Sequence, residues 1–367
     1  MGDAMGSRAR MLAIATVTLV VSLLILTSLY QPPSPPVEIE SGEPELIDVN
    51  WRGEVTDIKA LVANGTEYLF ALHRTGAGDG LMMNYDTISY MRHLVTGWTR
   101  PTIIELDPEV YRTFDVLYDA TNDEFLIFFR HEYRPDHYGP VGLYLARGPL
   151  DGLGPPQPIV VTLVEYPRGP YDMSAVLNDN GTIDLFYRFV TGMTENLNAL
   201  FHTAFNGTTW SDPEQLGVGN SPSAIRGRDG KLQLYSNLMT YTDKVQYCVD
   251  EWSVRDGEWA HKAVTTSARD CNVEPFVIED GSGDRFLIYE HEEYGSGAMT
   301  DLLLQIRPYG GTWGRYVRIV TDLPGNSDDP RYYWYGIENP SATIREDGLN
   351  VYYIHLGEVY TLPVWLD

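Results

Sequence analysis

The stretch Tyr171–Val190, which reads YDMSAVLNDNGTIDLFYRFV, has alternating apolar residues on both sides of the tetrapeptide Asn-Asp-Asn-Gly. Alternation interrupted by a Gly-containing turn predicts a β-hairpin. A hairpin brings its own two ends together, so we expect Asp172 and Arg188 to lie side by side. The sequence leaves open whether this pair is a local salt bridge or one part of a larger site.

The same pattern of strand, polar turn and aromatic-rich strand recurs at intervals of roughly 50 to 65 residues, a spacing typical of propeller blades. Most copies are followed by a third strand, a Gly/Trp corner such as NGTTW from Asn206, and a fourth apolar segment. Four strands in each of six repeats predict an all-β, six-bladed β-propeller, with a β-sandwich plus a second domain as the alternative. The six copies begin near Asp57, Asp115, Asp172, Ser221, Glu274 and Asn339.

The sixth copy ends early. After His355 only LGEVYTLPVWLD remains, which is enough for a third strand but not for a fourth. The N-terminal segment Glu45–Trp51, ELIDVNW, could supply the missing strand. Because this pairing would close the ring and cover an open sheet edge, we expect the last blade to be closed by the N-terminal strand.

The composition is that of a folded protein with a solvated exterior surface. The chain has 367 residues, 43% of them hydrophobic and 21% charged, which is enough apolar material for a sizeable core. Its formal net charge of -25 would repel phosphates, so nucleic acid is excluded as a partner. No motif requires a cofactor, and we expect none.

A hydrophobic run near the N-terminus predicts a membrane anchor. Met11–Leu29 carries no charge and is long enough to cross a bilayer core of about 30 Å. Arg8 and Arg10 precede it and acidic residues follow, so the N-terminus should be cytoplasmic. A cleaved signal peptide is the alternative. The expected parts are a cytoplasmic N-terminus (1–10), a transmembrane signal anchor (11–30), a Pro-rich linker (31–44) and an extracytoplasmic propeller (45–367).

Two cysteines, Cys248 and Cys271, would lie outside the membrane, where thiols oxidise. We expect them to form a disulfide, with two free thiols as the alternative. Three Asn-Gly-Thr sequons begin at Asn64, Asn180 and Asn206. Since Asn-Gly also favours hairpin turns, the sequence leaves their glycosylation open.

Carboxylates gather where the first strand of each blade begins. In a propeller this strand lines the central channel, and the second strand returns beside it, so strand starts and strand returns should share one mouth. Acids that converge in a low-dielectric channel raise one another's pKa and make an acid/base couple possible. The alternative is that each acid only neutralises its own Arg or His. The candidate catalytic residues are Asp57, Asp115, Asp172 and Glu274.

Cations and aromatic rings accompany these acids, a combination that suits a sugar carrying a carboxylate. The return ends supply Arg130, Arg188, His73, His291 and His355, and the loops supply Tyr111, Arg112, Arg168, Tyr171 and Tyr335. The three histidines come from blades that become neighbours when the ring closes, so they could instead hold Zn²⁺ or a similar ion. Histidines that hydrogen-bond to carboxylates are the alternative.

Two Trp corners carry a resemblance to a known family. They match the Gly-x-Thr-Trp end of the Asp-box at Gly207, Thr209 and Trp210, and again at Gly310, Thr312 and Trp313. From Glu45 to Asp367 the chain therefore resembles the six-bladed sialidase and BNR-repeat superfamily, which implies a sialidase-like glycoside hydrolase. The Asp-box Ser and Asp are replaced, in one copy by Thr203 and Phe205, and the family's Arg-Ile/Leu-Pro segment is absent. The strand starts also look like those of five-bladed furanosidases, which place acids there.

The sequence therefore predicts a membrane-anchored, extracytoplasmic propeller that engages carbohydrate. Two mouth carboxylates could cleave a glycosidic bond, one as acid and the other as base or nucleophile. The alternative is a non-catalytic propeller that serves as a protein-interaction or cell-envelope module. Its partners would be a glycan or a cell-surface protein, besides the membrane.

Overall fold

The computed structural model describes residues 38–51, 53–74, 86–132, 138–165, 169–190, 198–241, 245–265, 270–293, 301–321 and 337–366. The chain divides into two compact units. The larger unit, Glu40–Trp365, contains nearly all of the described residues. Most of the other, Met1–Ile39 with Leu366–Asp367, lies outside them.

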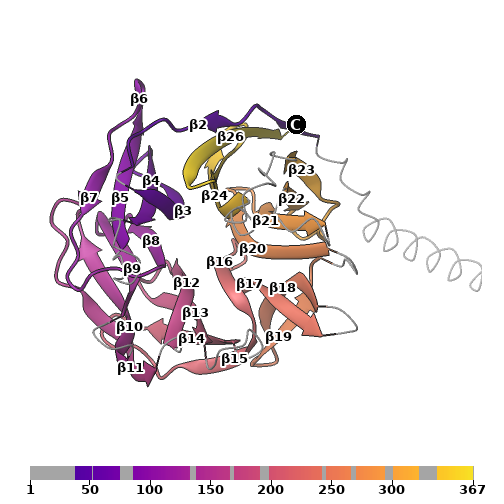
Figure 1. The fold of residues 1–367 in the computed structure, drawn as a ribbon. Coiled ribbons are helices and arrows are strands. Elements are labelled where there is room, and N and C mark those ends of the chain that lie inside the picture. Colours follow the sequence, from indigo (N-terminus) through magenta and orange to yellow (C-terminus); the bar gives the residue numbers. More distant parts are fainter. Residues whose placement is uncertain are drawn as a thin grey trace, which may run out of the picture. The chain divides into compact units, whose positions relative to one another are not determined.

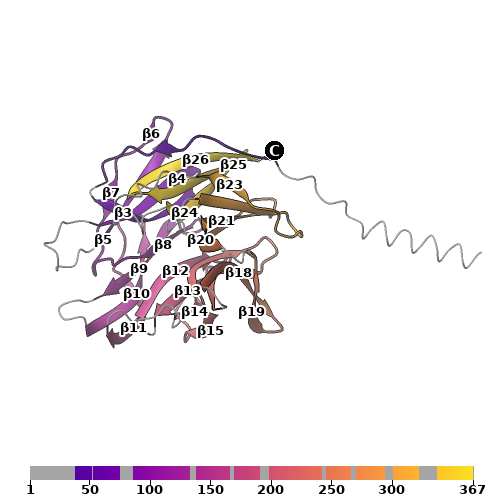
Figure 2. The ribbon, with the colours of Figure 1, turned by 45° about the vertical axis from the view of Figure 1, so that its right-hand side comes forward.

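The larger unit is the expected all-β, six-bladed propeller, with its sheets arranged around a central axis (Figures 1 and 2). Blade one contains β3 (Glu54–Ala63), β4 (Thr66–Arg74), β5 (Asp86–Leu94), β6 (Gly97–Trp98) and β7 (Thr102–Ile104). Blade two contains β8 (Phe114–Asp119), β9 (Glu124–Glu132), β10 (Tyr138–Gly148) and β11 (Gln157–Glu165). Blade three contains β12 (Gly169–Leu177), β13 (Ile183–Val190), β14 (Asn198–Phe205) and β15 (Glu214–Val218).

Blades four and five join into one sheet through a single parallel pairing. Blade four contains β16 (Asn220–Arg226), β17 (Leu232–Tyr241), β18 (Val245–Arg255) and β19 (Glu258–Ala263). Blade five contains β20 (Asp270–Glu279), β21 (Arg285–Glu293), β22 (Asp301–Arg307) and β23 (Val317–Val320). Blade six contains β24 (Ile337–Arg345), β25 (Gly348–His355) and β26 (Glu358–Leu366), with β1 (Ile39–Ser41) and β2 (Glu45–Leu46) at its outer edge.

The outer edge of blade six carries the N-terminal segment, as the short sixth repeat predicts. Glu45 and Leu46 of β2 pair with Thr361 and Tyr360 of β26. The next residue, Ile47, donates its backbone N–H to the carbonyl of Val359 at 2.9 Å. Ile47 is buried in an apolar cluster that blades one and six share, so the segment closes the ring through both backbone pairing and packing.

Most first strands begin with an irregularity that the hairpin pattern does not predict. The register of the first hairpin shifts at its start in blades one, three, four, five and six, between Val55/Asp57, Pro170/Met173, Asn220/Ser223, Val273/Phe276 and Glu338/Ser341. Three residues at these bulges have left-handed backbones: Ser221 (φ 45°), Glu274 (φ 49°) and Asn339 (φ 52°). Such conformations are uncommon for residues other than glycine and occur often at functional sites.

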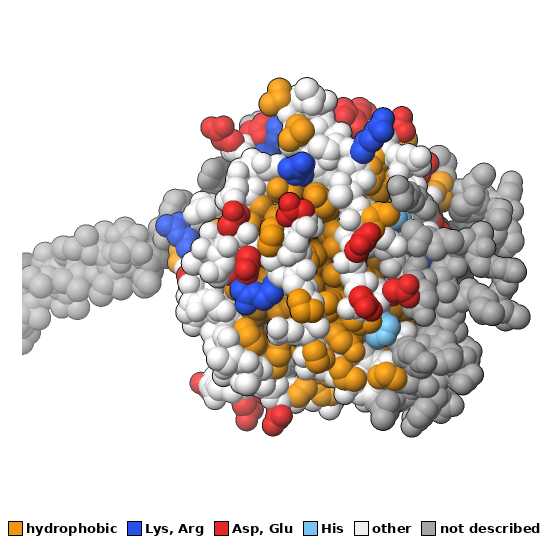
Figure 3. All heavy atoms as spheres, turned by 90° about the vertical axis from the view of Figure 1, so that its left-hand side faces the viewer, with side chains coloured by type: hydrophobic (Ala, Val, Ile, Leu, Met, Phe, Trp, Pro, Cys, Tyr) orange, Lys and Arg blue, Asp and Glu red, His pale blue; other side chains and the backbone are white. Residues whose placement is uncertain are grey.

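Aromatic and aliphatic side chains fill the seams between blades. Between blades one and two, buried residues such as Phe70, Phe114 and Phe129 form one cluster, and the partly buried Tyr90 and Tyr144 pack against it. Figure 3 views the side formed by these blades and shows hydrophobic side chains gathered in a band across it, with acidic and basic groups around them. The aromatic-rich second strands of the repeat therefore serve as packing surfaces.

The expected disulfide is wrong, because Cys248 carries a free thiol. Strands β18 and β20 meet with Tyr247, and not Cys248, opposite Cys271. Successive residues of a strand project to opposite faces of the sheet, so the side chain of Cys248 projects to the face opposite that of the position paired with Cys271. Its Sγ lies 3.7 Å from Oδ1 of Asp250, and burial raises the pKa of the thiol to about 11.

The predicted anchor at 11–30 lies outside the described residues. Within the described part of the chain, no helix has the length and apolar character needed to span a membrane.

The closing segment gives a test of the fold. Ile47→Ala should lower the free energy of unfolding by about 2–4 kcal/mol, because it empties a buried site at the seam of blades one and six. Leu46→Ala is the matched control, since Leu46 is 45% exposed and its loss should cost less than about 0.5 kcal/mol. Denaturant titrations of both variants measure the difference. Equal effects would contradict closure by packing.

Candidate functional site

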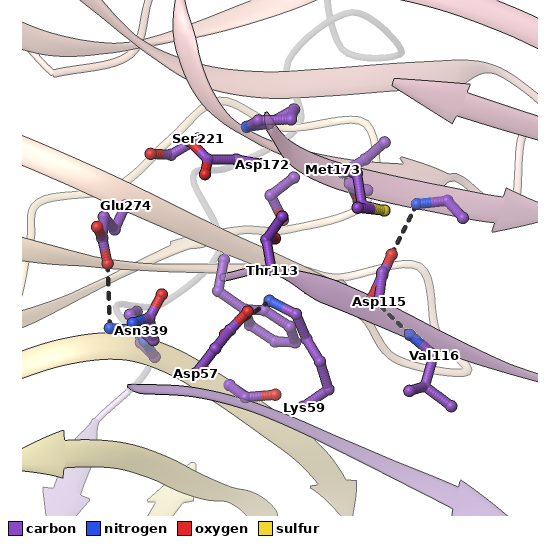
Figure 4. A pocket seen from close by; sticks show the side chains of 18 of the residues that line it. Asp57, Lys59, Thr113, Asp115, Val116, Asp172, Met173, Ser221, Glu274 and Asn339 are labelled. Carbon is purple, nitrogen blue, oxygen red and sulfur yellow. Dashed lines mark hydrogen bonds and ion pairs between the residues drawn. The ribbon is translucent and has the colours of Figure 1, made fainter. Parts of the chain in front are cut away.

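A cavity of about 380 Å³ opens at the channel mouth. The first strands of all six blades line it, namely β3, β8, β12, β16, β20 and β24, together with residues just before β8 (Figure 4). This volume falls within the range typical of small-molecule sites. All four predicted carboxylates, Asp57, Asp115, Asp172 and Glu274, are among its lining residues.

Hydrogen bonds between neighbouring first strands define the layers of the cavity. The backbone N–H of Ala224 donates to Ser174 Oγ of the preceding blade at 2.9 Å, and that of Val277 donates to Ser223 Oγ at 3.0 Å. The N–H of Ala60 likewise donates to Ser341 Oγ at 2.9 Å, which joins blade six to blade one. These serines occupy equivalent positions, two residues after the mouth residue of each blade.

Asp115 belongs to this serine layer and lies one layer deeper than the other three acids. Its Oδ2 accepts the N–H of Ala175 at 2.7 Å, and its Oδ1 accepts the N–H of Val116 at 2.9 Å. The mouth position of blade two is held by Thr113 instead. The alignment of the repeats predicts Asp115 in the outer ring, and this is wrong. Asp115 lies two residues after Thr113, as each serine lies two residues after the mouth residue of its blade, and it accepts a backbone N–H from the next blade as the serines do. The outer ring consists of Asp57, Thr113, Asp172, Ser221, Glu274 and Asn339.

Asp57 is the most deeply buried acid of the outer ring. Its side chain is buried, and Nζ of Lys59 lies 3.5 Å from its Oδ1. Burial raises the pKa of Asp57 to about 7; Lys59 opposes the rise, and the charges of Glu274, Asp115 and Asp172 add to it. Asp57 can therefore hold or release a proton near neutral pH.

Asp172 forms the ion pair that the hairpin Tyr171–Val190 predicts. Nε of Arg188 lies 2.9 Å from Oδ2 of Asp172, and the two side chains are 22% and 34% exposed. Glu274 is fixed differently, because its Oε2 accepts the backbone N–H of Asn339 at 3.1 Å. The mouth thus presents one buried acid, Asp57, and two partly exposed, oriented acids.

Arg130, a predicted substrate-binding residue, is fully buried and committed to other contacts. Its guanidinium forms an ion pair with Glu132 and donates from Nε to the carbonyl of Pro170 at 2.7 Å. It also lies over two aromatic rings, 4.7 Å from the centroid of Tyr111 and 4.0 Å from that of Tyr171. Arg130, Tyr111 and Tyr171 therefore form a buried stack that ties blades two and three together rather than a surface for a ligand.

The three histidines do not form a metal centre. Nε2 of His73 lies 2.7 Å from Ser89 Oγ, and Nδ1 of His291 lies 3.0 Å from Asn272 Oδ1, while His355 packs near the ring of Tyr360. Across the described residues, no three His, Cys, Asp or Glu side chains are placed to hold a metal ion.

Strand register explains why His73 and Arg130 project to opposite faces of their blades. Lys59 and Asp115 occupy equivalent positions, each two residues after the mouth residue of its blade. Phe70 pairs with Lys59, and Phe128 pairs with Asp115. His73 lies three residues past Phe70, whereas Arg130 lies two past Phe128, so the two side chains project to opposite faces of their blades.

Two basic residues at the cavity complete the described site. Arg112, a predicted binding residue, is exposed and lines the cavity, with a left-handed backbone at φ 66° and its N–H bonded to Asp86 Oδ2 at 2.6 Å. Lys59 was missed by sequence reasoning, although a single lysine between apolar residues of a first strand is a visible signal. Arg168 and Tyr335 lie outside the described residues.

Solved structures match this fold over most of the chain, whereas no family model and no curated protein matches it. A protein of unknown function from Dyadobacter fermentans is 14% identical over 90% of this chain and 99% of its own, with a TM-score of 0.66. The Penicillium chrysogenum α-L-arabinanase complexed with arabinobiose is 11% identical over 89% and 98%, with a TM-score of 0.59. The GH93 α-L-arabinofuranosidase of Fusarium graminearum, also with arabinobiose, is 9% identical over 88% and 98%, with a TM-score of 0.60.

Identities this low show a shared fold alone. The structural neighbours of the propeller include glycoside hydrolases, which agrees with the furanosidase-like strand starts at the level of the fold. Membership of the sialidase and BNR-repeat superfamily stays a prediction.

The buried acid gives a prediction for stability against pH. The pKa of Asp57 is about 7 in the folded protein and 3.8 for the free group, so the folded state binds its proton more tightly. The contribution of Asp57 to stability should therefore fall as the pH rises from about 4 to 7 and stay low above that range. Asp57→Asn should remove this loss and make the protein more stable at pH 8, by on the order of 2–4 kcal/mol.

Denaturant titrations at pH 5 and pH 8 on both proteins measure this effect. The exposed Asp212, replaced by Asn, is the control and should leave the pH dependence unchanged. An Asp57→Asn variant that is less stable than the parent protein at pH 8 would show that the ionised carboxylate is stabilising.

Proposed function

We propose that the cavity binds a neutral saccharide and that Asp57 and Asp172 cleave a glycosidic bond within it. The observation that carries this proposal is the pairing of a buried acid whose pKa is about 7 with an oriented, ion-paired carboxylate across the same mouth. Glycoside hydrolysis uses two carboxyl groups in different protonation states, and different environments are how proteins create that difference.

Asp57 suits the role of general acid. A group with a pKa near the working pH is protonated often enough to donate and is acidic enough to release its proton to the leaving oxygen. Its burial among first strands also keeps competing water away from the proton. Lys59 lies beside it and holds its carboxylate.

Asp172 suits the role of base or nucleophile. Its ion pair with Arg188, at 2.9 Å between Nε and Oδ2, fixes the direction of the carboxylate. At 34% exposure its side chain can still reach a water molecule or a sugar. Glu274 is the next candidate, but one of its oxygens is bonded to the backbone of Asn339.

The charges at the mouth favour a neutral sugar over an acidic one. Arg130 is buried and Arg188 is paired with Asp172, so the two arginines expected to grip a sugar carboxylate are committed. Four acids line the cavity against Lys59 and Arg112, and an anionic ligand would be repelled. Arabinobiose, the ligand named for the two fungal neighbours, is consistent with this choice.

The test uses the purified full-length chain in detergent and a panel of neutral oligosaccharides, arabinan fragments among them, beside sialylated and uronic-acid glycans. We expect hydrolysis within the neutral set, and a loss of kcat of about 10²–10⁴-fold in Asp57→Asn and in Asp172→Asn. Asp212→Asn should retain full activity. Activity should also fall above pH 7, as Asp57 loses its proton.

Two results would reject this function. Hydrolysis that survives in Asp57→Asn would remove the acid from the mechanism. Failure of every glycan to bind or react would favour the non-catalytic interaction module.

We also propose that residues 11–30 anchor the chain in a membrane with the propeller outside. The uncharged run and the basic residues before it support this orientation. Protease added to intact cells should remove the propeller and leave the N-terminal fragment with the membrane. A propeller that resists protease until the cells are lysed would contradict the orientation, and a soluble chain would contradict the anchor.

A further inference from the structure

The serine layer of the channel contains a charged exception next to the candidate acid. Its positions in blades three, four and six are serines that accept a backbone N–H from the following blade. Blade five has an apolar residue there, and blades one and two have opposite charges. In blade order, the layer reads Lys59, Asp115, Ser174, Ser223, Phe276 and Ser341.

Lys59 cannot do what the serines do. A lysine ammonium has three donors and no acceptor, so it cannot receive a backbone N–H from the next blade. The N–H that a serine at this position would serve is that of Val116. Asp115 accepts that N–H with Oδ1 and the N–H of Ala175 with Oδ2, so one carboxylate satisfies two strands. Because Asp115 serves Val116, the residue at position 59 does not have to provide an acceptor for that N–H group.

The ammonium of Lys59 lies among acids from several blades. Its Nζ is 3.5 Å from Asp57 Oδ1 on the same strand. Burial alone would lower the pKa of Lys59, but Asp57, Asp115 and Glu274 outweigh it and raise the pKa. Lys59 therefore stays charged across the neutral range.

The charged groups that bear on Asp57 come from four strands. Lys59 lies on β3, Asp115 on β8, Asp172 on β12 and Glu274 on β20. Arg112 lines the same cavity. Of these four groups in the described part of the chain, Lys59 is a cation that lowers the pKa of Asp57, and the other three are acids that raise it.

We propose that Lys59 is a positioning residue that orients the Asp57 carboxylate and sets how tightly it holds its proton. This inference rests on the proposed role of Asp57 as the acid. Without the ammonium, three acids and burial would act on Asp57 unopposed, and it would hold its proton to higher pH. With the ammonium, the proton can leave near neutral pH.

The experiment measures the titration of Asp57 directly, without substrate. Full-length protein with ¹³C-labelled aspartate carboxyl groups is titrated by NMR, and Asp57→Asn identifies the signal. Two neutral variants, Lys59→Met and Lys59→Gln, guard against the failure of one to fold. Lys59→Arg keeps the charge, and Lys231→Met removes an exposed lysine that pairs with Asp229 elsewhere.

We expect the midpoint of Asp57 to rise by about one pH unit or more in both neutral variants, a tenfold tighter hold on the proton. Lys59→Arg and Lys231→Met should stay near the parent value. On any saccharide that the parent protein cleaves, the high-pH limb of kcat/KM should move upward by the same amount.

An unchanged or lowered midpoint in the neutral variants would overturn the inference. So would an equal rise in Lys59→Arg, because the effect would then come from shape and not from charge. A raised midpoint in a protein that cleaves no glycan would support the coupling of Lys59 to Asp57 and reject the proposed hydrolase, so the two failures are distinguishable.

Discussion

The first strands of a propeller have a free edge that faces the channel, and their backbone N–H groups need acceptors there. A buried donor without a partner costs as much as a lost hydrogen bond, so side chains of the channel serve as acceptors for these N–H groups. Ser174, Ser223 and Ser341 do so with hydroxyl groups, and Asp115 does so with a carboxylate. The spacing of the blades around the cavity depends on these contacts.

Asp115 links this structural requirement to the chemistry of the mouth. By accepting the N–H groups of both Val116 and Ala175, it lets blade one carry a lysine where blades three, four and six carry serine. That lysine lies beside Asp57 and offsets part of the effect of burial and of the neighbouring acids. The charge that supports the proposed acid therefore depends on the carboxylate of Asp115 in the serine layer.

The bulges at the start of the first strands determine which side chains the mouth presents to the cavity. An extra residue at the start of a strand turns its side chain toward the cavity, and left-handed backbones at Ser221, Glu274 and Asn339 show where this happens. Arg112 has the same backbone class just before β8. Several cavity residues are thus presented by conformations that ordinary strands avoid, which agrees with a binding function for this end of the propeller.

The sequence by itself determined the repeat, the number of blades, the closing N-terminal segment and the Asp172–Arg188 pair, because each follows from alternation, spacing or hairpin geometry. Only the tertiary structure decided which acids share a layer and which cations face the cavity. Both His73 and Arg130 are held by buried partners away from the mouth that their spacing suggested, His73 beside Ser89 and Arg130 beside Glu132. Proton affinity was decided the same way, since the pKa of Asp57 depends on burial and on charges from four different strands.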